Sequence, residues 1–314
     1  MELRKLKPGE FLPSRRKMAA KTGAGRQIIE KILADEIASG RVVALPRKGY
    51  VRNPRRQDLL LVNLAEDVAE SRYHKRIVDV LVAEAEKRGI PVRIRFGNIS
   101  GKEPELPDKL FVVAGESPET VQAIRARGKT CITILPRFSS EIGGTVRNSE
   151  KLIYLQLAEF FRHGAHRIAY THQVADNREN HTFLLRREAY YRWMAEHGLQ
   201  VWPHHVCFAG KDAEEFRGSL EKMFTLPPRP DAVICAPFRL RELYSVLRAH
   251  SLRPMFDVRI SCEETDDVPV PPPLMIRNTS AEVAKLAWIL MERALAGADN
   301  AADTLVPQWN FISR

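Results

Sequence analysis

The sequence has few cysteines, and none of them are spaced as metal ligands. The chain has 314 residues, and its four cysteines are Cys131, Cys207, Cys235 and Cys262. No two of them lie within 25 residues of each other. This spacing excludes a zinc knuckle and a thioredoxin-like CxxC site. Scattered cysteines in a chain of this length predict a reducing, cytoplasmic setting.

Long apolar runs are also lacking. No stretch approaches the roughly 18 apolar residues that a membrane-spanning helix needs. The basic segment MELRKLKPGEFLPSRRK has no apolar core of the kind found in secretory signals. We therefore expect neither a secretory signal nor a membrane partner.

Signatures of catalysis are missing as well. The sequence contains no GxSxG, no HExxH, no Walker loop and no glycine-rich dinucleotide fingerprint. The histidines lack a second histidine four residues away on an expected helix, which favours structural or surface roles over a metal site. The acids of Glu263-Glu264 and Asp266-Asp267 are expected to form a solvated loop. We predict no catalytic residue, no metal and no cofactor.

Positive charge is abundant in one part of the chain only. Residues 1–57 hold 15 Lys and Arg against 5 Asp and Glu, and residues 58–314 hold 34 of each sign. The whole net charge of +10 therefore belongs to the first fifth of the chain. Such asymmetry indicates a polyanion-binding module on a neutral body, with a solvated basic tail as the alternative.

The first 57 residues have the pattern of a small DNA-binding domain. Helical spacing of apolar residues predicts helices over 14–21 and 25–39, the first capped by Ser14. Gly40 is expected to end the second helix. Short strands are expected over 41–45 and 50–52. The order helix, turn, helix and basic hairpin is typical of a winged helix-turn-helix.

The second helix would enter the major groove with Arg26, Gln27 and Lys31. Arg and Gln suit this task because each can make two hydrogen bonds to a base edge. Cations placed to contact phosphates are Arg15, Arg16, Lys17, Arg47 and Lys48. The partner expected for this segment is double-stranded DNA.

This segment resembles a known family. LKPGEFLPSRRKMAAKTGAGRQIIEKILADEIASGRVVALPRKGYV is similar to the DNA-binding domain of GntR-type bacterial repressors. The shared features are PG followed by LPS, an Arg two residues later, a TG turn, an Arg opening the next helix and a wing ending in Gly-aromatic-Val. The resemblance implies that Ser14 and Arg16 contact phosphates, that Arg26 and Gln27 reach bases, and that Gly49 permits a tight wing tip.

Three features depart from that family. The family has a further helix before the PG turn, where this sequence shows only MELRK. Gly25 stands where the family has Ser, and Glu30 stands where an Arg is often found. The two substitutions, at Gly25 and Glu30, affect the details of base recognition that the resemblance implies.

The neutral body alternates between strand-like and helical segments. Apolar runs such as 59–64 and 131–135 alternate with amphipathic stretches such as 72–88 and 281–295. This alternation predicts an α/β fold with parallel sheets and helices on both faces. Residues 53–57, which include a proline, are expected to be the linker between a head over 1–52 and a body over 58–314.

The body resembles the effector-binding domain of LacI/GalR-type repressors, which is similar to type I periplasmic sugar-binding proteins. The resemblance runs over five segments in order, among them HGAHRIAY followed by RREAYYRWMAEHGL. It implies two α/β lobes joined by three chain crossings, with a small molecule in the cleft. The first lobe would comprise 58–146 and 278–301, and the second would comprise 147–277 and 302–314.

Several residues are expected to line that cleft. By resemblance, Arg186 matches the sugar-binding Arg of the family, and Glu264 lies near its acid. Ser71, Arg72 and Tyr73 fall in the first strand–helix loop. For Arg186 the alternative is a surface ion pair with a nearby acid.

Two departures suggest a different ligand. Arg147 replaces an Asp of the family, and Phe238 with its neighbour Pro237 replaces a polar pair. Phe238 is an aromatic that can stack on a sugar ring. Arg147, Arg186 and Arg239 together would make the cleft cationic, which indicates an acidic ligand such as a sugar acid or sugar phosphate.

The sequence therefore predicts a cytoplasmic, non-enzymatic transcription regulator, such as a repressor, acting as a homodimer. Its DNA affinity would be controlled by a small molecule, such as a sugar, in the cleft. Two other hypotheses remain open. One is a sugar-binding module without a regulatory role, and the other is a sugar-modifying enzyme.

Overall fold

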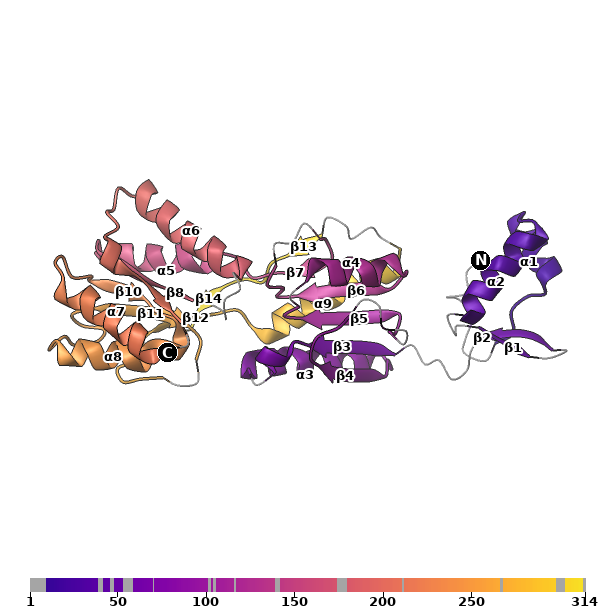
Figure 1. Cartoon of the computed structure of the whole chain (residues 1–314), viewed down its shortest axis with the longest axis horizontal. Helices are drawn as coiled ribbons and strands as arrows, with labels where there is room; N and C mark the ends of the chain where they lie inside the picture. Colours follow the sequence, from indigo (N-terminus) through magenta and orange to yellow (C-terminus); the bar gives the residue numbers. More distant parts are fainter. Residues whose placement is uncertain are drawn as a thin grey trace.

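The computed structural model describes most of the chain (Figure 1). The described residues are 10–38, 42–45, 48–52, 59–69, 71–100, 103, 106–115, 117–138, 142–173, 180–210, 212–265, 268–297 and 303–312. The predicted helix end at Gly40, the predicted phosphate contact Arg47 and the predicted linker 53–57 lie outside them. Within the described part, no helix is both long enough and apolar enough to cross a bilayer.

The head contains two helices followed by a hairpin. The helices are α1 (Arg15–Thr22) and α2 (Arg26–Ala38), and the antiparallel strands are β1 (Val42–Leu45) and β2 (Gly49–Arg52). Ser14 caps α1, since its Oγ accepts a hydrogen bond from the Lys17 backbone amide at 3.3 Å. Gly23 has φ +67°, a left-handed conformation that glycine adopts without strain and that lets the chain turn between the helices. The predicted order of elements is confirmed.

The core of the head is small. Leu12, Met18, Ile29, Leu33 and Val42 pack together across both helices and the hairpin. Of the apolar residues on α2, Ile28, Ile32 and Ile37 are exposed. The helical spacing therefore predicted the helix correctly, whereas the apolar face of that helix is only half covered among the described residues.

The first lobe is built on one sheet, in the order β13-β7-β6-β5-β3-β4. Its strands are β3 (Leu60–Leu64), β4 (Val92–Phe96), β5 (Lys109–Val113), β6 (Thr130–Ile134), β7 (Thr145–Val146) and β13 (Thr304–Leu305). All neighbouring strands are parallel. Its helices are η2 (Glu66–Val68), α3 (Arg72–Lys87), α4 (Pro118–Ala126) and α9 (Ser280–Leu295).

The second lobe repeats this plan, in the order β14-β12-β11-β10-β8-β9. Its strands are β8 (Ile168–Gln173), β9 (Val206–Ala209), β10 (Ala232–Ile234), β11 (Arg259–Glu263), β12 (Leu274–Arg277) and β14 (Asn310–Phe311). Only β14 pairs antiparallel among these described strands. Its helices are α5 (Lys151–Arg162), α6 (His181–Glu196), η3 (Pro203–His205), α7 (Ala213–Thr225), η4 (Pro237–Arg239) and α8 (Leu240–Ala249).

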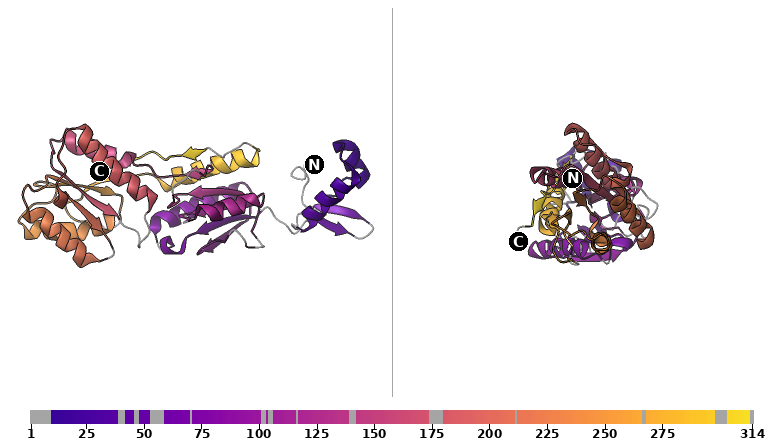
Figure 2. Two further views of the ribbon diagram at one scale, coloured as in Figure 1. Left: turned by 45° about the horizontal axis from the view of Figure 1, so that its top comes forward. Right: turned by 90° about the vertical axis from the view of Figure 1, so that its left-hand side faces the viewer.

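Each sheet is buried on both faces, as Figures 1 and 2 show. In the first lobe, α3 and α9 cover one face and α4 covers the other. In the second lobe, α7 and α8 cover one face and α5 and α6 cover the other. Strand β3 shows why, since all five of its residues are buried and alternate between the two faces. The four cysteines lie in these cores.

The chain passes between the lobes three times, and one predicted boundary is wrong. It crosses after β7, returns after β12 and crosses again after β13. Because β13 pairs with β7 in the first sheet, residues 303–305 belong to the first lobe and not to the second. The last crossing therefore begins at Val306, and only β14 joins the second sheet.

Two short elements show little pattern in the sequence. Residues 201–207 alternate weakly between apolar and polar, yet Pro203 opens the short helix η3 and β9 begins only at Val206. The strand β7 was not predicted, because two residues are too short to show an alternating pattern.

Candidate functional site

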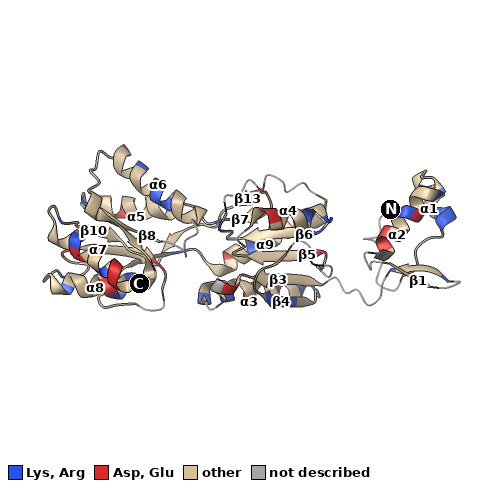
Figure 3. Cartoon of the chain, viewed as in Figure 1, with Lys and Arg blue, Asp and Glu red and all other residues tan. Residues whose placement is uncertain are grey.

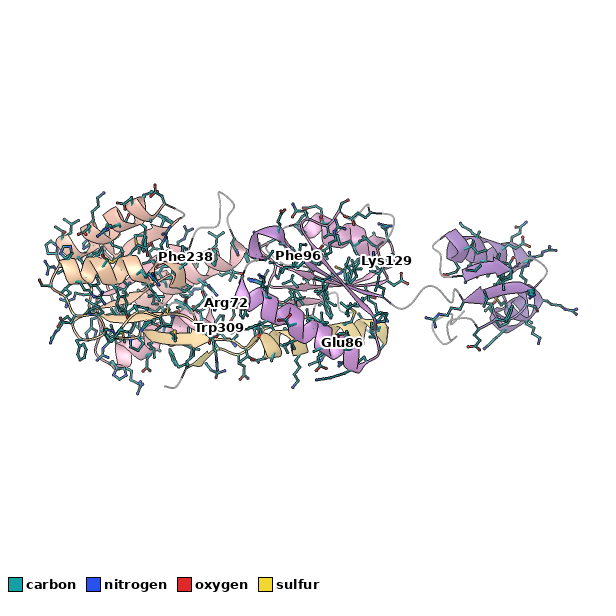
Figure 4. All side chains as sticks on the ribbon, turned by 90° about the horizontal axis from the view of Figure 1, so that it is seen from below. Arg72, Glu86, Phe96, Lys129, Phe238 and Trp309 are labelled. Carbon is teal, nitrogen blue, oxygen red and sulfur yellow. The ribbon has the colours of Figure 1, made fainter. Side chains whose placement is uncertain are left out.

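The candidate site lies where the two lobes face each other. Parallel strands end at the same edge of a sheet, and the three crossings run between those edges. Arg72 from the first lobe and Trp309 from the last crossing lie at this junction, and Phe238 lies at the facing end of the second lobe (Figure 4). The backbone also bridges the lobes, since the His181 amide donates to the Arg137 carbonyl at 2.9 Å.

A buried ion pair occupies the edge of the second sheet. Arg186, on α6, donates from both terminal nitrogens to the two oxygens of Glu263 at the end of β11, at 2.7 and 3.1 Å. The Arg186 side chain is 5% exposed and that of Glu263 is 25% exposed. The guanidinium also lies near the rings of Phe183 and Trp309. The pairing that sequence reasoning held as the alternative for Arg186 is thus present, and it is buried.

A pocket opens beside this ion pair. Its cavity volume is about 20 Å³, room for about one water molecule, and its lining, which comes from the second lobe, includes Gln156, Thr171, Arg186 and Glu263. The Gln156 amide nitrogen donates to the Ser261 hydroxyl at 2.8 Å, while its Oε1 finds no partner among the described residues. Arg186 Nε is likewise buried without a described partner. The pocket therefore has a buried acceptor and a buried donor beside it, which a polar ligand group could pair if it reached them.

A hydrogen-bonded chain connects the start of α3 to two of the crossings. The Tyr73 hydroxyl, at the start of α3, donates to Asn278 Oδ1, and Asn278 Nδ2 donates to Asn148 Oδ1 at 2.6 Å. Asn278 is buried and follows β12, and Asn148 follows β7. Burial raises the pKa of Tyr73, and the nearby charge of Glu263 raises it further. Tyr73 therefore lies within electrostatic reach of the ion pair on the other lobe.

A second group of polar residues faces the junction from the first crossing. Arg147 is half-buried and donates to the Phe138 carbonyl at 3.1 Å. Burial lowers its pKa, an effect that Glu150 partly offsets. The pKa of His181 is lowered by burial and then by the positive charge of Arg147. The structure thus brings Arg147, from the first lobe's edge, close to the start of α6.

The other residues predicted to line the cleft do not reach the pocket beside Arg186. Glu264 is exposed toward Arg277, with which it pairs at 3.0 Å, so the acid that meets Arg186 is its neighbour Glu263. Phe238 is 55% exposed. Ser71 Oγ lies 2.9 Å from His74 Nδ1. Arg72 is exposed at the start of α3.

Arg239, the third cation of the proposed cationic cleft, lies elsewhere in the lobe. Its guanidinium donates to the Gly210 carbonyl and to Glu242, at 2.6 and 2.7 Å. It is therefore held at the end of β9 and not at the pocket beside Arg186.

Sequence reasoning missed three residues of this site. Glu263 was set aside as part of a solvated acidic loop, although adjacent residues on a strand point to opposite faces. Asn278 was noted only as the start of the segment 278–301, and Gln156 was not singled out among the residues of its helix. Gln156 is buried on α5 together with Leu152, Ile153 and Leu157. A polar residue on an otherwise apolar helix face is a signal that can be read from sequence.

The head presents its predicted DNA contacts on the surface. Exposed residues include Arg15, Arg16, Arg26, Gln27, Lys31, Lys48 and, at the turn, Gly49. Ser14 is exposed and committed to capping α1. Gly49 has φ +103°, which only glycine adopts easily. The charged residues of α1 are all positive, whereas α2 carries both signs (Figure 3).

No metal centre is formed by the described residues, where no three His, Cys, Asp or Glu side chains are grouped to bind an ion. His204 and His205 are structural, since both bond to the Pro228 carbonyl through Nε2, at 3.2 and 2.8 Å. Burial raises the pKa of the Cys131 and Cys207 thiols to about 12, so they stay protonated near neutral pH.

Known structures share this architecture. A LacI-family transcriptional regulator from Mycobacterium smegmatis is 18% identical, with a TM-score of 0.61 over 81% of this chain and 97% of its own. A LacI-family regulatory protein from Chloroflexus aggregans is 16% identical, with a TM-score of 0.67 over 81% and 97%. The transcriptional regulator CelR, in complex with cellobiose, is 16% identical, with a TM-score of 0.66 over 96% and 99%.

By sequence, no protein-family model and no curated protein matches the chain. The structural likeness confirms the predicted α/β fold with two periplasmic-binding-protein-like lobes and parallel sheets, the fold of the LacI-family regulators. At identities of this size it establishes the fold, and function must be argued from the site.

Breaking the Arg186–Glu263 pair is expected to destabilise the second lobe. Arg186→Met leaves a largely buried carboxylate without its partner, so we expect the free energy of unfolding to fall by about 3 kcal/mol in urea titrations. The double variant Arg186→Met with Glu263→Met should regain most of this loss, because it removes both charges. Equal losses in the single and double variants would show that the pair is not coupled.

His181 is expected to titrate below its usual pKa of 6.5. Its folded-state pKa is lowered, so the unfolded chain binds the proton more readily. The stability that neutral His181 contributes is therefore lost as the pH falls below about 6.5. An NMR titration should show the lowered pKa in the wild type and a higher value in Arg147→Met. An unchanged pKa in that variant would mean that the charge of Arg147 does not reach His181.

Proposed function

We propose that the chain is a DNA-binding transcription regulator whose affinity for its operator is set by a small molecule held between the lobes. One combination of features supports this proposal. The same chain carries a head with exposed cations on a helix-turn-helix and hairpin, and a two-lobed body with a pocket at the carboxyl edge of the second lobe's sheet. In this proposal the head is a winged helix-turn-helix of the GntR type.

The proposed ligand is an uncharged molecule rich in hydroxyl groups, such as a sugar. Arg186 is neutralised by Glu263, and Arg239 is paired with Glu242. Two of the three cations that favoured an acidic ligand are thus already compensated. A hydroxyl can donate to Gln156 Oε1 and accept from Arg186 Nε, whereas an anion would also meet the Glu263 carboxylate.

Lobe closure is proposed to link the pocket to the head. Tyr73 lies within electrostatic reach of Glu263 and bonds to Asn278, which in turn bonds to Asn148. A ligand that moves Arg186 and Glu263 changes the electrostatic surroundings of Tyr73. Because Asn278 and Asn148 lie on two of the crossings, the change reaches those crossings through the hydrogen bonds. In this proposal the protein is a homodimer whose two heads meet half-sites about one helical turn apart.

The head is expected to read bases with Gln27 and to hold phosphates with Arg16. We predict nanomolar, salt-sensitive binding of the full chain to DNA from the region upstream of its gene, measured by fluorescence anisotropy at two salt concentrations. Gln27→Ala should reduce the preference for that DNA over a scrambled duplex by about tenfold. Arg16→Ala should weaken binding to every sequence and lower the salt slope by about one.

Lys285→Ala provides a matched control, since it removes an exposed cation from α9 in the body. It should leave both the preference and the slope unchanged. Weak binding that is equal on all duplexes would contradict sequence-specific reading by the head. An equal effect of Lys285→Ala and Arg16→Ala would show that overall charge, and not the head, binds the DNA.

A further inference from the structure

One carboxylate holds two of the head's exposed cations. Glu30 lies on α2, where Oε1 accepts from Arg26 Nε at 3.0 Å and from Arg15 Nη1 at 3.0 Å. Arg26 is one helical turn earlier on α2, and Arg15 begins α1. Arg15 also lies 5.7 Å from the centre of the Tyr50 ring on β2. The group therefore connects both helices and the hairpin.

Stabilisation of the fold is a poor explanation for this arrangement. The side chains of Arg15, Arg26 and Glu30 are 48%, 82% and 40% exposed. Ion pairs this open to water contribute little to folding because solvent screens them. The pKa of Glu30 is nevertheless lowered, first through the hydrogen bond from Arg26, so the carboxylate is ionised at neutral pH.

The hydrogen bond from Arg26 to Glu30 uses only the Nε side of the guanidinium. With Nε engaged by Glu30, the two terminal nitrogens of the guanidinium remain as a forked pair of donors. Guanine presents two acceptors, O6 and N7, in the major groove, and a forked Arg matches them. A side chain biased toward one orientation loses less freedom on binding, which favours the forked contact with guanine.

We propose that Glu30 is the positioning residue that makes Arg26 a guanine reader. This inference rests on the DNA-binding function proposed above. Glu30 has a second effect, because its negative charge opposes phosphates and withholds Arg15 from them. Binding to unrelated DNA is thereby weakened, while the cognate guanine contact is kept.

The test is a selection from a randomised duplex library with the full-length protein, followed by anisotropy titrations on the selected duplex and on a scrambled one. The variants are Glu30→Ala, which removes the acceptor, and Glu30→Gln, which keeps a neutral acceptor for Arg26 Nε. Asp35→Asn is the matched control, since it removes the same charge from an exposed site further along α2. Circular dichroism establishes that each variant is folded.

We expect the wild type to select guanine at one position of each half-site. Glu30→Ala should reduce the preference for that guanine by about tenfold, the discrimination that a forked Arg–guanine contact provides. It should also bind scrambled DNA more tightly, with a salt slope steeper by about one as Arg15 is released to a phosphate. Glu30→Gln should recover part of the guanine preference, and Asp35→Asn should retain all of it.

Three outcomes would overturn the inference. A guanine preference that survives in Glu30→Ala would show that Arg26 needs no positioning. A wild-type preference for cytosine that disappears in Glu30→Ala would show that Glu30 reads the base itself, by accepting from the cytosine amino group. A wild type that selects no sequence would instead remove the DNA-reading function on which the inference rests.

Discussion

Parallel pairing of the strands constrains both lobes and places the candidate site. A parallel strand needs a crossover connection, so each sheet must be covered by helices, and its loops collect at the carboxyl edge. In both lobes that edge carries polar residues: Tyr73 and Arg147 in the first, Arg186 and Glu263 in the second. The three crossings run between these edges, so both sheets direct their carboxyl ends toward the junction.

Charge compensation then determines what that junction is suited to bind. Arg186 is fixed by the two hydrogen bonds that it donates to Glu263, and its remaining Nε and the nearby Gln156 Oε1 are unused by the described residues. Such a wall offers paired donors and acceptors with little net charge, which suits hydroxyl groups. The head has a similar arrangement, in which Glu30 pairs with both Arg15 and Arg26 and all three side chains remain exposed to solvent. In both places a carboxylate orients a guanidinium instead of simply neutralising it.

The long elements could be predicted from the sequence, and the site only in part. Amphipathic spacing in α3 and the fully apolar β3 have strong periodic signals, and both were predicted to within one residue. The two-residue strands β7 and β13 carry no such signal, and their pairing depends on contacts distant in sequence. We expected Glu264 at the place that Glu263 occupies. Adjacent residues on a strand point to opposite faces of the sheet, and no local pattern specifies which of the two acids points inward. Arg186 was located by resemblance, but its buried partner was not.

The most direct test of the account is whether a ligand in the cleft alters DNA binding. Neutral mono- and disaccharides, with the corresponding uronic acids, are added to the complex of the full chain with its upstream DNA while anisotropy is followed. The account predicts that a neutral saccharide changes the DNA affinity by about 5- to 150-fold, the usual range of coupling between sites. It also predicts that Gln156→Leu, which removes the buried acceptor, weakens this response without altering DNA binding in the absence of sugar. A DNA affinity that no saccharide changes, or a uronic acid that acts more strongly than its neutral counterpart, would contradict the account.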